Sequence, residues 1–237
     1  MFHLHGEIEH KNKDLSNSLF VLNMYLVKTP EFIQTFFPDY IWTGSSEEKV
    51  LYLSFDDGPI PEITPWVLKQ LAQYEAKATF FCVGENVKKH PSIFETLIES
   101  GHSIGNHTFN HLSGWSSDNA DYIDNVQQCA EVVTSKLFRP PYGRLKPKQA
   151  QQLKQDYRIV MWDILSGDFD PKISSDQCYK NVIKNAGPGS IIVFHDSKKA
   201  EEKLKYVLPR VLKYFSQQGY RFEQILEPSK VELATSS

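Results

Sequence analysis

Two adjacent aspartates, Asp56 and Asp57, come directly after an apolar run and directly before a Gly-Pro pair. Side chains alternate across a regular strand, so these neighbours cannot present equivalent oxygens to one ion. A division of labour follows, in which one carboxylate binds a cation and the other faces the reacting group. The competing interpretation is an Asx turn completed by Gly58 and Pro59, and the four residues alone do not separate the two.

Two histidines, His107 and His111, lie four positions apart in the segment GNHTFNH. On a helix this spacing places both rings on one face, which suits coordination of a zinc-like metal. Eight histidines in a chain of this length produce about 0.27 such pairs by chance, so the spacing alone is weak evidence. Its position after an expected strand favours the metal site.

Residues 139–143 (RPPYG) and His195 also follow expected strands. The prolines stiffen the first segment and its glycine permits a tight turn, which favours a fixed guanidinium at Arg139 and a fixed backbone amide. The alternative is an ordinary proline-rich turn with a surface arginine. A lone histidine at a strand end is usually structural or exposed. His195, however, would lie at the same end of the sheet as two carboxylates and two other histidines.

The segment 162–170 (WDILSGDFD) carries Asp163, Asp168 and Asp170 near Phe169. Three aspartates beside an aromatic ring predict an acid that supports the site and a wall of the substrate groove. A solvated loop is the alternative for Asp163 and Asp170.

Short β-rich runs alternate with longer helical patterns from residue 49 onward. We expect strands over 49–55, 77–83, 102–105, 137–139, 158–162, 190–194 and 220–223, and helices over 61–74, 91–100, 118–137, 147–156, 174–185 and 199–217. Such an alternation predicts one parallel sheet in an α/β fold. Active sites of these folds form at the carboxyl ends of the strands, where the polar segments lie. These observations alone indicate a metal-dependent hydrolase.

Taken in order, five segments resemble the polysaccharide deacetylases with a NodB homology domain, also called carbohydrate esterase family 4. Residues 54–59 (SFDDGP) are similar to the family's (T/S)FDDGP motif, and residues 107–111 (HTFNH) to its H(S/T)xxH motif. Residues 139–143 are similar to RxPYG, and residues 193–195 (VFH) to (L/V)xH. Residues 165–169 (LSGDF) correspond to the DxxDW motif.

The resemblance implies a metal-dependent hydrolase that removes an acetyl group, usually from N-acetylglucosamine in a glycan. By position, Asp57, His107 and His111 would bind the metal. Asp56 would be the general base and His195 the general acid. The metal is expected to be Zn²⁺ by ligand type, with Co²⁺ and Ni²⁺ as alternatives.

Three more residues take roles from the resemblance. Arg139 would hold the base, the backbone N–H of Tyr142 would contribute to the oxyanion site, and Asp168 would tune the catalytic histidine.

The chain departs from the family's pattern beside the expected groove. Leu165 replaces the first aspartate of the DxxDW motif, Phe169 replaces its tryptophan, and Val193 stands where leucine is frequent. In the family these positions border the acyl pocket or groove, and we expect Pro140, Phe169 and Val193 to line the groove here.

The likeness covers residues 49–224, about 175 residues, which is small for an eight-unit barrel of about 250 residues. We therefore expect a distorted or incomplete (β/α) TIM-like barrel with seven or eight parallel strands, the NodB homology fold. Residues 49–237 form the expected catalytic domain, and residues 1–48 an N-terminal extension that packs on the barrel. Residues 1–23 share little character with the rest, and Met24 is an alternative start.

The composition excludes several classes of protein. With 26 Lys and Arg against 29 Asp and Glu, a formal charge of −3 and a pI near 6.2, nothing favours a nucleic-acid partner. No apolar run approaches the roughly 18 residues of a transmembrane helix. The acidic, His-rich start does not resemble a secretory signal, so the expected location is cytoplasmic. The weak charge fits a partner that is mostly uncharged sugar.

The leading hypothesis is a deacetylase of peptidoglycan fragments or chitooligosaccharides. An O-acetyl esterase acting on xylan-like glycans would use the same chemistry on another substrate. A third possibility, from another class, is a metal-bound glycan-binding module with little turnover. The oligomeric state is not predicted.

Overall fold

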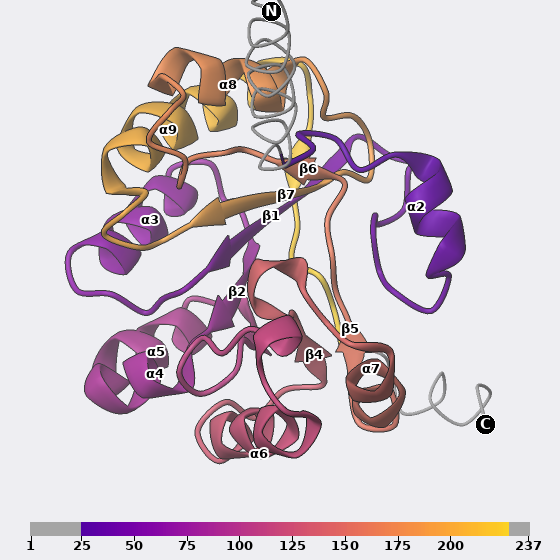
Figure 1. Cartoon of the computed structure of the whole chain (residues 1–237). Helices are drawn as coiled ribbons and strands as arrows, with labels where there is room; N and C mark the ends of the chain where they lie inside the picture. The colour runs from indigo at the N-terminus through magenta and orange to yellow at the C-terminus, as the bar shows by residue number, and fades with distance from the viewer. Residues whose placement is uncertain (1–24, 228–237) are drawn as a thin grey trace, which may run out of the picture.

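The computed structural model describes residues 25–227 (Figure 1). The strands are β1 (Val50–Asp56), β2 (Ala78–Cys82), β3 (Ser103–Asn106), β4 (Leu137–Phe138), β5 (Arg158–Ile159), β6 (Ile164–Leu165), β7 (Ile191–His195) and β8 (Arg221–Phe222). The helices are α2 (Glu31–Phe36), α3 (Ile63–Ala72), α4 (Gly84–Lys89), α5 (Pro91–Glu99), α6 (Asn119–Ala130), α7 (Pro147–Leu153), α8 (Ser175–Ile183) and α9 (Glu201–Gln217). Two short 3-10 helices, η2 (Gly114–Ser116) and η3 (Pro141–Gly143), lie in loops.

The strands form one parallel sheet in the order β5-β4-β3-β2-β1-β7-β6, and β8 pairs with the start of β1. The sheet curls, and β5 and β6 stand at the two ends of this path, so the barrel is incomplete (Figure 1). The predicted fold, an incomplete barrel of parallel strands, is confirmed.

The register of β1 against β7 positions the chemistry. Ser54 pairs with Val193 and Asp56 with His195, so both pairs lie on the inner face of the curved sheet. The alternate residues Leu53 and Phe55 point outward and are fully buried under the helices. The alternation of this strand thus separates an apolar outer face from a polar inner one.

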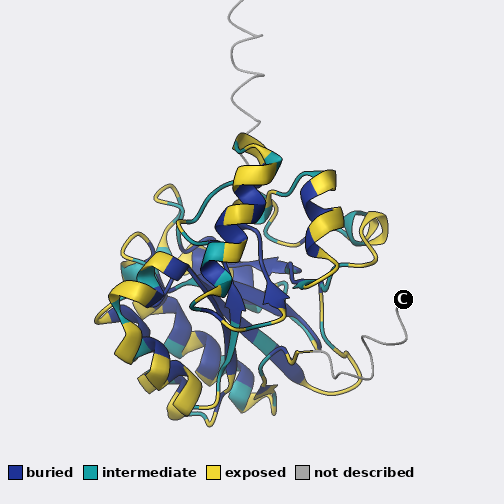
Figure 2. Cartoon of the chain, turned by 90° about the horizontal axis from the view of Figure 1, so that it is seen from below, coloured by how far each residue is buried: buried dark blue, intermediate teal, exposed yellow. Residues whose placement is uncertain are grey.

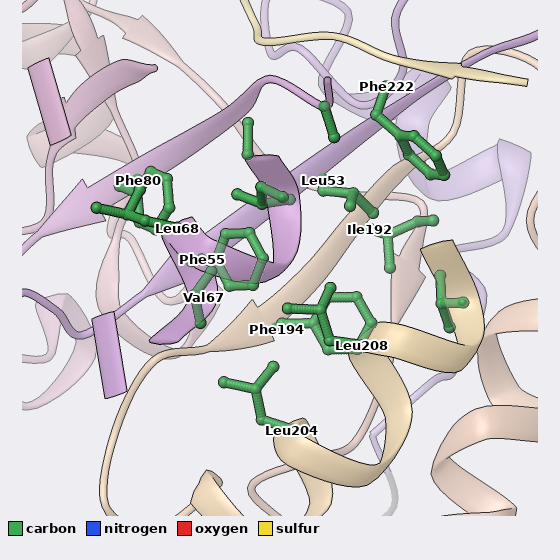
Figure 3. Packing of buried hydrophobic residues seen from close by; sticks show 14 of the residues in the cluster. Leu53, Phe55, Val67, Leu68, Phe80, Ile192, Phe194, Leu204, Leu208 and Phe222 are labelled. Carbon is green, nitrogen blue, oxygen red and sulfur yellow. The ribbon is translucent and has the colours of Figure 1, made fainter. Parts of the chain in front are cut away.

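The main core lies between the outer face of the sheet and the helices that cover it. Figure 3 shows Phe55, Phe80 and Phe194 from three neighbouring strands against leucines and a valine of α3 and α9. The rings of Phe55 and Phe80 stack with centroids 4.9 Å apart. In Figure 2 the strands are buried and the helices expose their outer faces, as amphipathic helices on a sheet must.

Residues 25–48 contact both ends of the sheet. The Leu165 N–H donates to Val27 O at 2.8 Å beside β6, and the Met161 N–H donates to Ile41 O at 2.7 Å just beyond β5. This segment therefore bridges the open side of the barrel. The expectations about residues 1–23 and Met24 fall outside the described residues.

Some sequence-based boundaries were wrong. The strand expected over 158–162 is shorter, since β5 ends at Ile159, and a further strand, β6, lies in a segment that was not expected to form one. Two-residue strands carry too little periodicity to be recognised from sequence. Helix α4 was not expected. No helix among residues 25–227 is long and apolar enough to cross a membrane.

Candidate active site

Asp56 ends β1 in contact with a fully buried arginine. Arg139 Nη1 donates to Asp56 Oδ1 at 2.7 Å and to Ser54 Oγ at 2.8 Å. The other guanidinium nitrogens donate to the carbonyls of Val160 (3.2 Å) and Met161 (2.9 Å). Burial lowers the pKa of Arg139 from its usual value, and the charge of Asp56 opposes this change. The alternative of a surface arginine is therefore wrong.

Asp57 leaves the strand in a left-handed conformation, with φ of 85°, and its carboxylate meets two histidines instead of the arginine. Asp57 Oδ1 lies 3.2 Å from His111 Nε2 and 3.9 Å from His107 Nε2. Potential ligand atoms of the three residues lie within 4.8 Å of one another. The two neighbouring carboxylates thus have different partners, as their division of labour requires.

The histidine pair is built by a loop and not by the helix that its spacing suggested. Thr108 and His111 both have positive φ, 63° and 60°. The Asn106 side chain accepts from the Thr108 N–H at 2.9 Å, and Asn125 Oδ1 accepts from two further amides of the loop. These buried amide side chains replace the missing backbone ladder and hold the two rings 5.2 Å apart.

The donor set fits a divalent metal. His107 Nδ1 lies 2.7 Å from the Arg139 carbonyl, which can only accept, so Nδ1 carries the hydrogen and Nε2 presents its lone pair to Asp57. Burial lowers the pKa of His107 to about 4, so the ring is neutral at pH 7. Burial alone would raise the pKa of Asp57, but the surrounding histidines, His111 first, hold it below its usual range. Asp57 Oδ1 is buried and accepts no well-formed hydrogen bond. Two imidazole nitrogens and this oxygen are a ligand set that zinc-like ions prefer.

His195 is held by a fully buried aspartate on the other side of Asp56. Asp168 Oδ1 lies 2.8 Å from His195 Nδ1, and Oδ2 accepts the His195 backbone N–H at 2.7 Å. Burial alone would lower the pKa of His195, but the charge and hydrogen bond of Asp168 outweigh it and raise the pKa to about 9. The ring is therefore protonated at neutral pH and can act as an acid.

Sequence reasoning missed the residues that hold the turn after β1. Asp196 is fully buried and accepts hydrogen bonds from the Gly58 N–H (3.0 Å) and the Thr64 hydroxyl. Burial raises the pKa of Asp196 to about 8. A Cβ on Gly58 would lie 2.0 Å from Asp196 Oδ2, so this position requires glycine. Asn86 Nδ2 donates to the Asp57 carbonyl at 2.7 Å. The only sequence signal was an aspartate directly after His195.

The remaining expected site residues divide into exposed and buried groups. Tyr142 is exposed, has φ of 61°, and places its ring 4.7 Å from that of His111. Phe169 is half-buried and meets His195 edge-on, with centroids 5.1 Å apart. Pro140 and Val193 are buried, so of the three expected groove residues Phe169 is the one that reaches solvent.

Asp163 lies away from these groups. It is buried and accepts hydrogen bonds from the Ser190 hydroxyl (2.8 Å) and the Ile191 N–H (2.7 Å), so it is not part of a solvated loop. Its carboxylate joins the start of β7 to the segment before β6 and has a structural role.

The chain is similar in sequence and in structure to known proteins. Residues 43–160 match the family model described as polysaccharide deacetylase. A peptidoglycan-N-acetylglucosamine deacetylase of Bacillus cereus is 34% identical over 196 residues, which are 78% of this chain and 91% of the relative. A chitooligosaccharide deacetylase of Azorhizobium caulinodans is 35% identical over 161 residues, 64% of this chain and 76% of the relative. The crystal structure of the peptidoglycan N-acetylglucosamine deacetylase Bc1960 superposes with a TM-score of 0.76 at 31% identity, covering 83% of this chain and 95% of that one.

Proposed function

This chain belongs to the polysaccharide deacetylase family and is a hydrolase of amide bonds, and from that premise we propose that it removes acetyl groups from N-acetylglucosamine units of peptidoglycan fragments or chitooligosaccharides. One observation carries the proposal. The triad of Asp57, His107 and His111 lies beside Asp56, the carboxylate that pairs in register with His195, and the pKa of His195 is raised to about 9. A metal-dependent amide hydrolase uses this combination of a cation, a base and an acid.

The metal triad has a defined part in this reaction. A divalent cation held by Asp57, His107 and His111 would act as a Lewis acid toward the acetyl carbonyl and favour ionisation of the attacking water. The hydrogen bond from His107 Nδ1 to the Arg139 carbonyl keeps the Nε2 lone pair directed at this centre. Zn²⁺ is proposed by ligand type, with Co²⁺ and Ni²⁺ as alternatives.

The proton transfers use the two buried pairs. Asp56 takes a proton from the attacking water, while Arg139 holds its Oδ1 and sets the orientation of the carboxylate. Addition of water to the acetyl carbon produces a tetrahedral oxyanion, which the backbone N–H of Tyr142 helps to stabilise. His195, held at Nδ1 by Asp168, donates the Nε2 proton to the sugar nitrogen. The C–N bond then breaks, and acetate and a free amine leave.

The protonated His195 favours N-deacetylation over the O-acetyl esterase alternative. An amine anion is a much poorer leaving group than an alkoxide, so an amide hydrolase depends more on an acid that is charged at neutral pH. A glycan-binding module with little turnover would need neither the Asp56–Arg139 pair nor the Asp168–His195 pair.

Acetate release tests the proposal. The protein is incubated with chitooligosaccharides, peptidoglycan and acetylated xylan, with and without a chelator, and divalent metals are then added back. We expect acetate from an N-acetylated glycan, loss of that activity on chelation and recovery with metal. Metal-loaded protein that releases acetate from none of the three substrates would contradict an enzymatic function, and release from xylan alone would favour the esterase.

A further inference from the structure

A row of exposed side chains leads away from the metal triad along the surface. Tyr142, which contacts His111, is 61% exposed, and Trp115 is 62% exposed. The guanidinium carbon of Arg144 lies between them, 5.9 Å from the Tyr142 ring centroid and 5.1 Å from that of Trp115. We call Tyr142, Arg144 and Trp115 the aromatic row. The reaction steps described above do not use the side chains of this row.

The loops that carry the row are fastened together by a buried glutamine. Gln149 Nε2 donates to the Gly114 carbonyl at 3.0 Å, and its Oε1 accepts the Lys146 N–H at 2.9 Å. Lys146 Nζ donates to the Ser117 carbonyl at 2.6 Å. A Cβ on Gly114 would lie 2.6 Å from the Arg144 carbonyl, so the two loops meet backbone to backbone. Trp115 therefore stands on a loop held beside η3, and its position relative to the metal triad is set.

Two exposed cations lie near the site, although the whole chain carries a net charge of −3. Across residues 25–227, Arg144 is exposed and forms no ion pair. On the other side of the site Lys199 lies 5.5 Å above the Phe169 ring, which contacts His195, and within the same described part it also forms no ion pair. Its neighbour Lys198, in contrast, lies near Glu62 and Glu201. On each side of the site, therefore, a cation without an ion pair among the described residues lies near an aromatic ring.

We propose, on the basis of the proposed function, that the aromatic row binds the sugar next to the reacting N-acetylglucosamine and that Arg144 pairs with a carboxylate on it. In peptidoglycan the neighbouring sugar carries a lactyl carboxylate or the peptide linked to it, whereas every sugar of a chitooligosaccharide is neutral. Exposed aromatic rings offer the apolar contact that the C–H face of a sugar requires, and a guanidinium binds a carboxylate through two parallel hydrogen bonds. The substrate class that matches this surface is peptidoglycan, with Lys199 adding a second positive charge.

The preference arises from attraction to the anionic substrate and not from exclusion of the neutral one. Arg144 is exposed, so its charge stays hydrated when a neutral sugar occupies the row and incurs no desolvation penalty. The ratio of kcat/KM for the two substrates is therefore the quantity that reports on Arg144.

The experiment compares a soluble, carboxylate-bearing peptidoglycan fragment with a neutral chitooligosaccharide of the same number of sugars, using the metal-loaded full chain. We expect the wild-type protein to prefer the anionic fragment, and Arg144→Gln to reduce the ratio of kcat/KM values by about tenfold, the size of one charge-assisted hydrogen bond. Arg144→Lys should retain part of the preference. Raising the ionic strength should reduce the ratio for the wild type more than for Arg144→Gln.

A matched control is Arg210→Gln, which removes another exposed arginine stacked on a ring, 3.7 Å from that of Tyr206 on α9. It should leave the ratio unchanged. Trp115→Ala should raise KM for both substrates by a similar factor, because contact with a sugar face does not depend on charge.

Two results would overturn the inference while leaving the proposed function intact: a wild-type preference for the neutral substrate, or the same ratio in Arg144→Gln and the wild type at unchanged thermal stability. Absence of acetate from both substrates would overturn the proposed function itself, and the inference with it.

Discussion

Asp56 and Asp57 are neighbours in the chain, yet their carboxylates have opposite surroundings. Asp56 stays on the regular strand and receives a short hydrogen bond from the buried Arg139. Asp57 turns away at positive φ, and one of its oxygens is buried among histidine rings without a well-formed hydrogen bond. The first carboxylate is paired with a buried guanidinium, and the second has histidine rings around it.

The same difference divides the whole site. In its proposed proton-transfer half, the pairs Asp56–Arg139 and Asp168–His195, each charge has a protein partner, and Asp56 and His195 lie at the ends of β1 and β7. Its proposed metal half, Asp57, His107 and His111, is built on turns and brings potential ligand atoms within 4.8 Å of one another. The comparison teaches that the two halves compensate burial differently: one pairs its buried charges with each other, and the other leaves ligand lone pairs free.

The largest effect is expected from breaking the proton-transfer half without touching the metal half. Asp56→Asn removes the base and should lower kcat for acetate release by about 10³-fold or more, while the protein still binds one metal ion. His107→Ala should instead weaken metal binding itself, measured by metal content after dialysis. Equal loss of metal in the two variants would show that the neighbouring carboxylates do not divide their roles as described.

The countercharge inside the proton-transfer half is tested by Arg139→Met. The substitution leaves the Asp56 charge buried without a partner, and we expect a loss of about 3–5 kcal/mol in the free energy of unfolding, measured by denaturant titration. Arg221→Met is the matched control, because Arg221 forms exposed ion pairs with Glu48 and Glu223 and should matter little. Similar losses in both variants would remove the distinction between buried and exposed pairs.

The smallest expected effect concerns pH. The acid form of His195 is present below its raised pKa of about 9, so kcat/KM should fall as the pH rises through that value. Asp168→Asn removes the main cause of the increase, so the alkaline limb should move toward the ordinary histidine pKa of about 6.5, with about a tenfold loss at pH 7.5. The control Asp163→Asn changes a buried aspartate outside the site and should not move the limb. An unchanged limb in Asp168→Asn would mean that another group is the acid.

Much of this organisation could be predicted because it is local in the sequence. The alternation of β1, the parallel α/β pattern and the polar segments after the strands all follow from periodicity over short windows. The type of turn was not predictable to the same degree. The His107–His111 segment has helical spacing, but buried amide side chains from other elements hold it as a loop. Short strands such as β6 were also not recognised from the sequence, because two residues are too few to show a hydrophobic periodicity.

Burial of polar groups was the other limit. Asp196 and Asp163 look alike in the sequence, as aspartates beside apolar strands, and both are buried. Asp196 secures the turn that carries Asp57 through Gly58, whereas Asp163 secures the start of β7. Only the contacts distinguish their roles.

The sequence by itself determined the fold class, the family and the order of the polar segments along the chain, since these depend on residue type and spacing. The tertiary structure decided which atoms meet: Arg139 reaches Asp56 across 83 positions, and Asp168 reaches His195 across 27. The tertiary structure also places Arg144 and Lys199 on either side of the candidate active site. Pairing, burial and the resulting pKa values are properties of distance in space, and a charge acts on its neighbours through that distance whatever their separation in the chain.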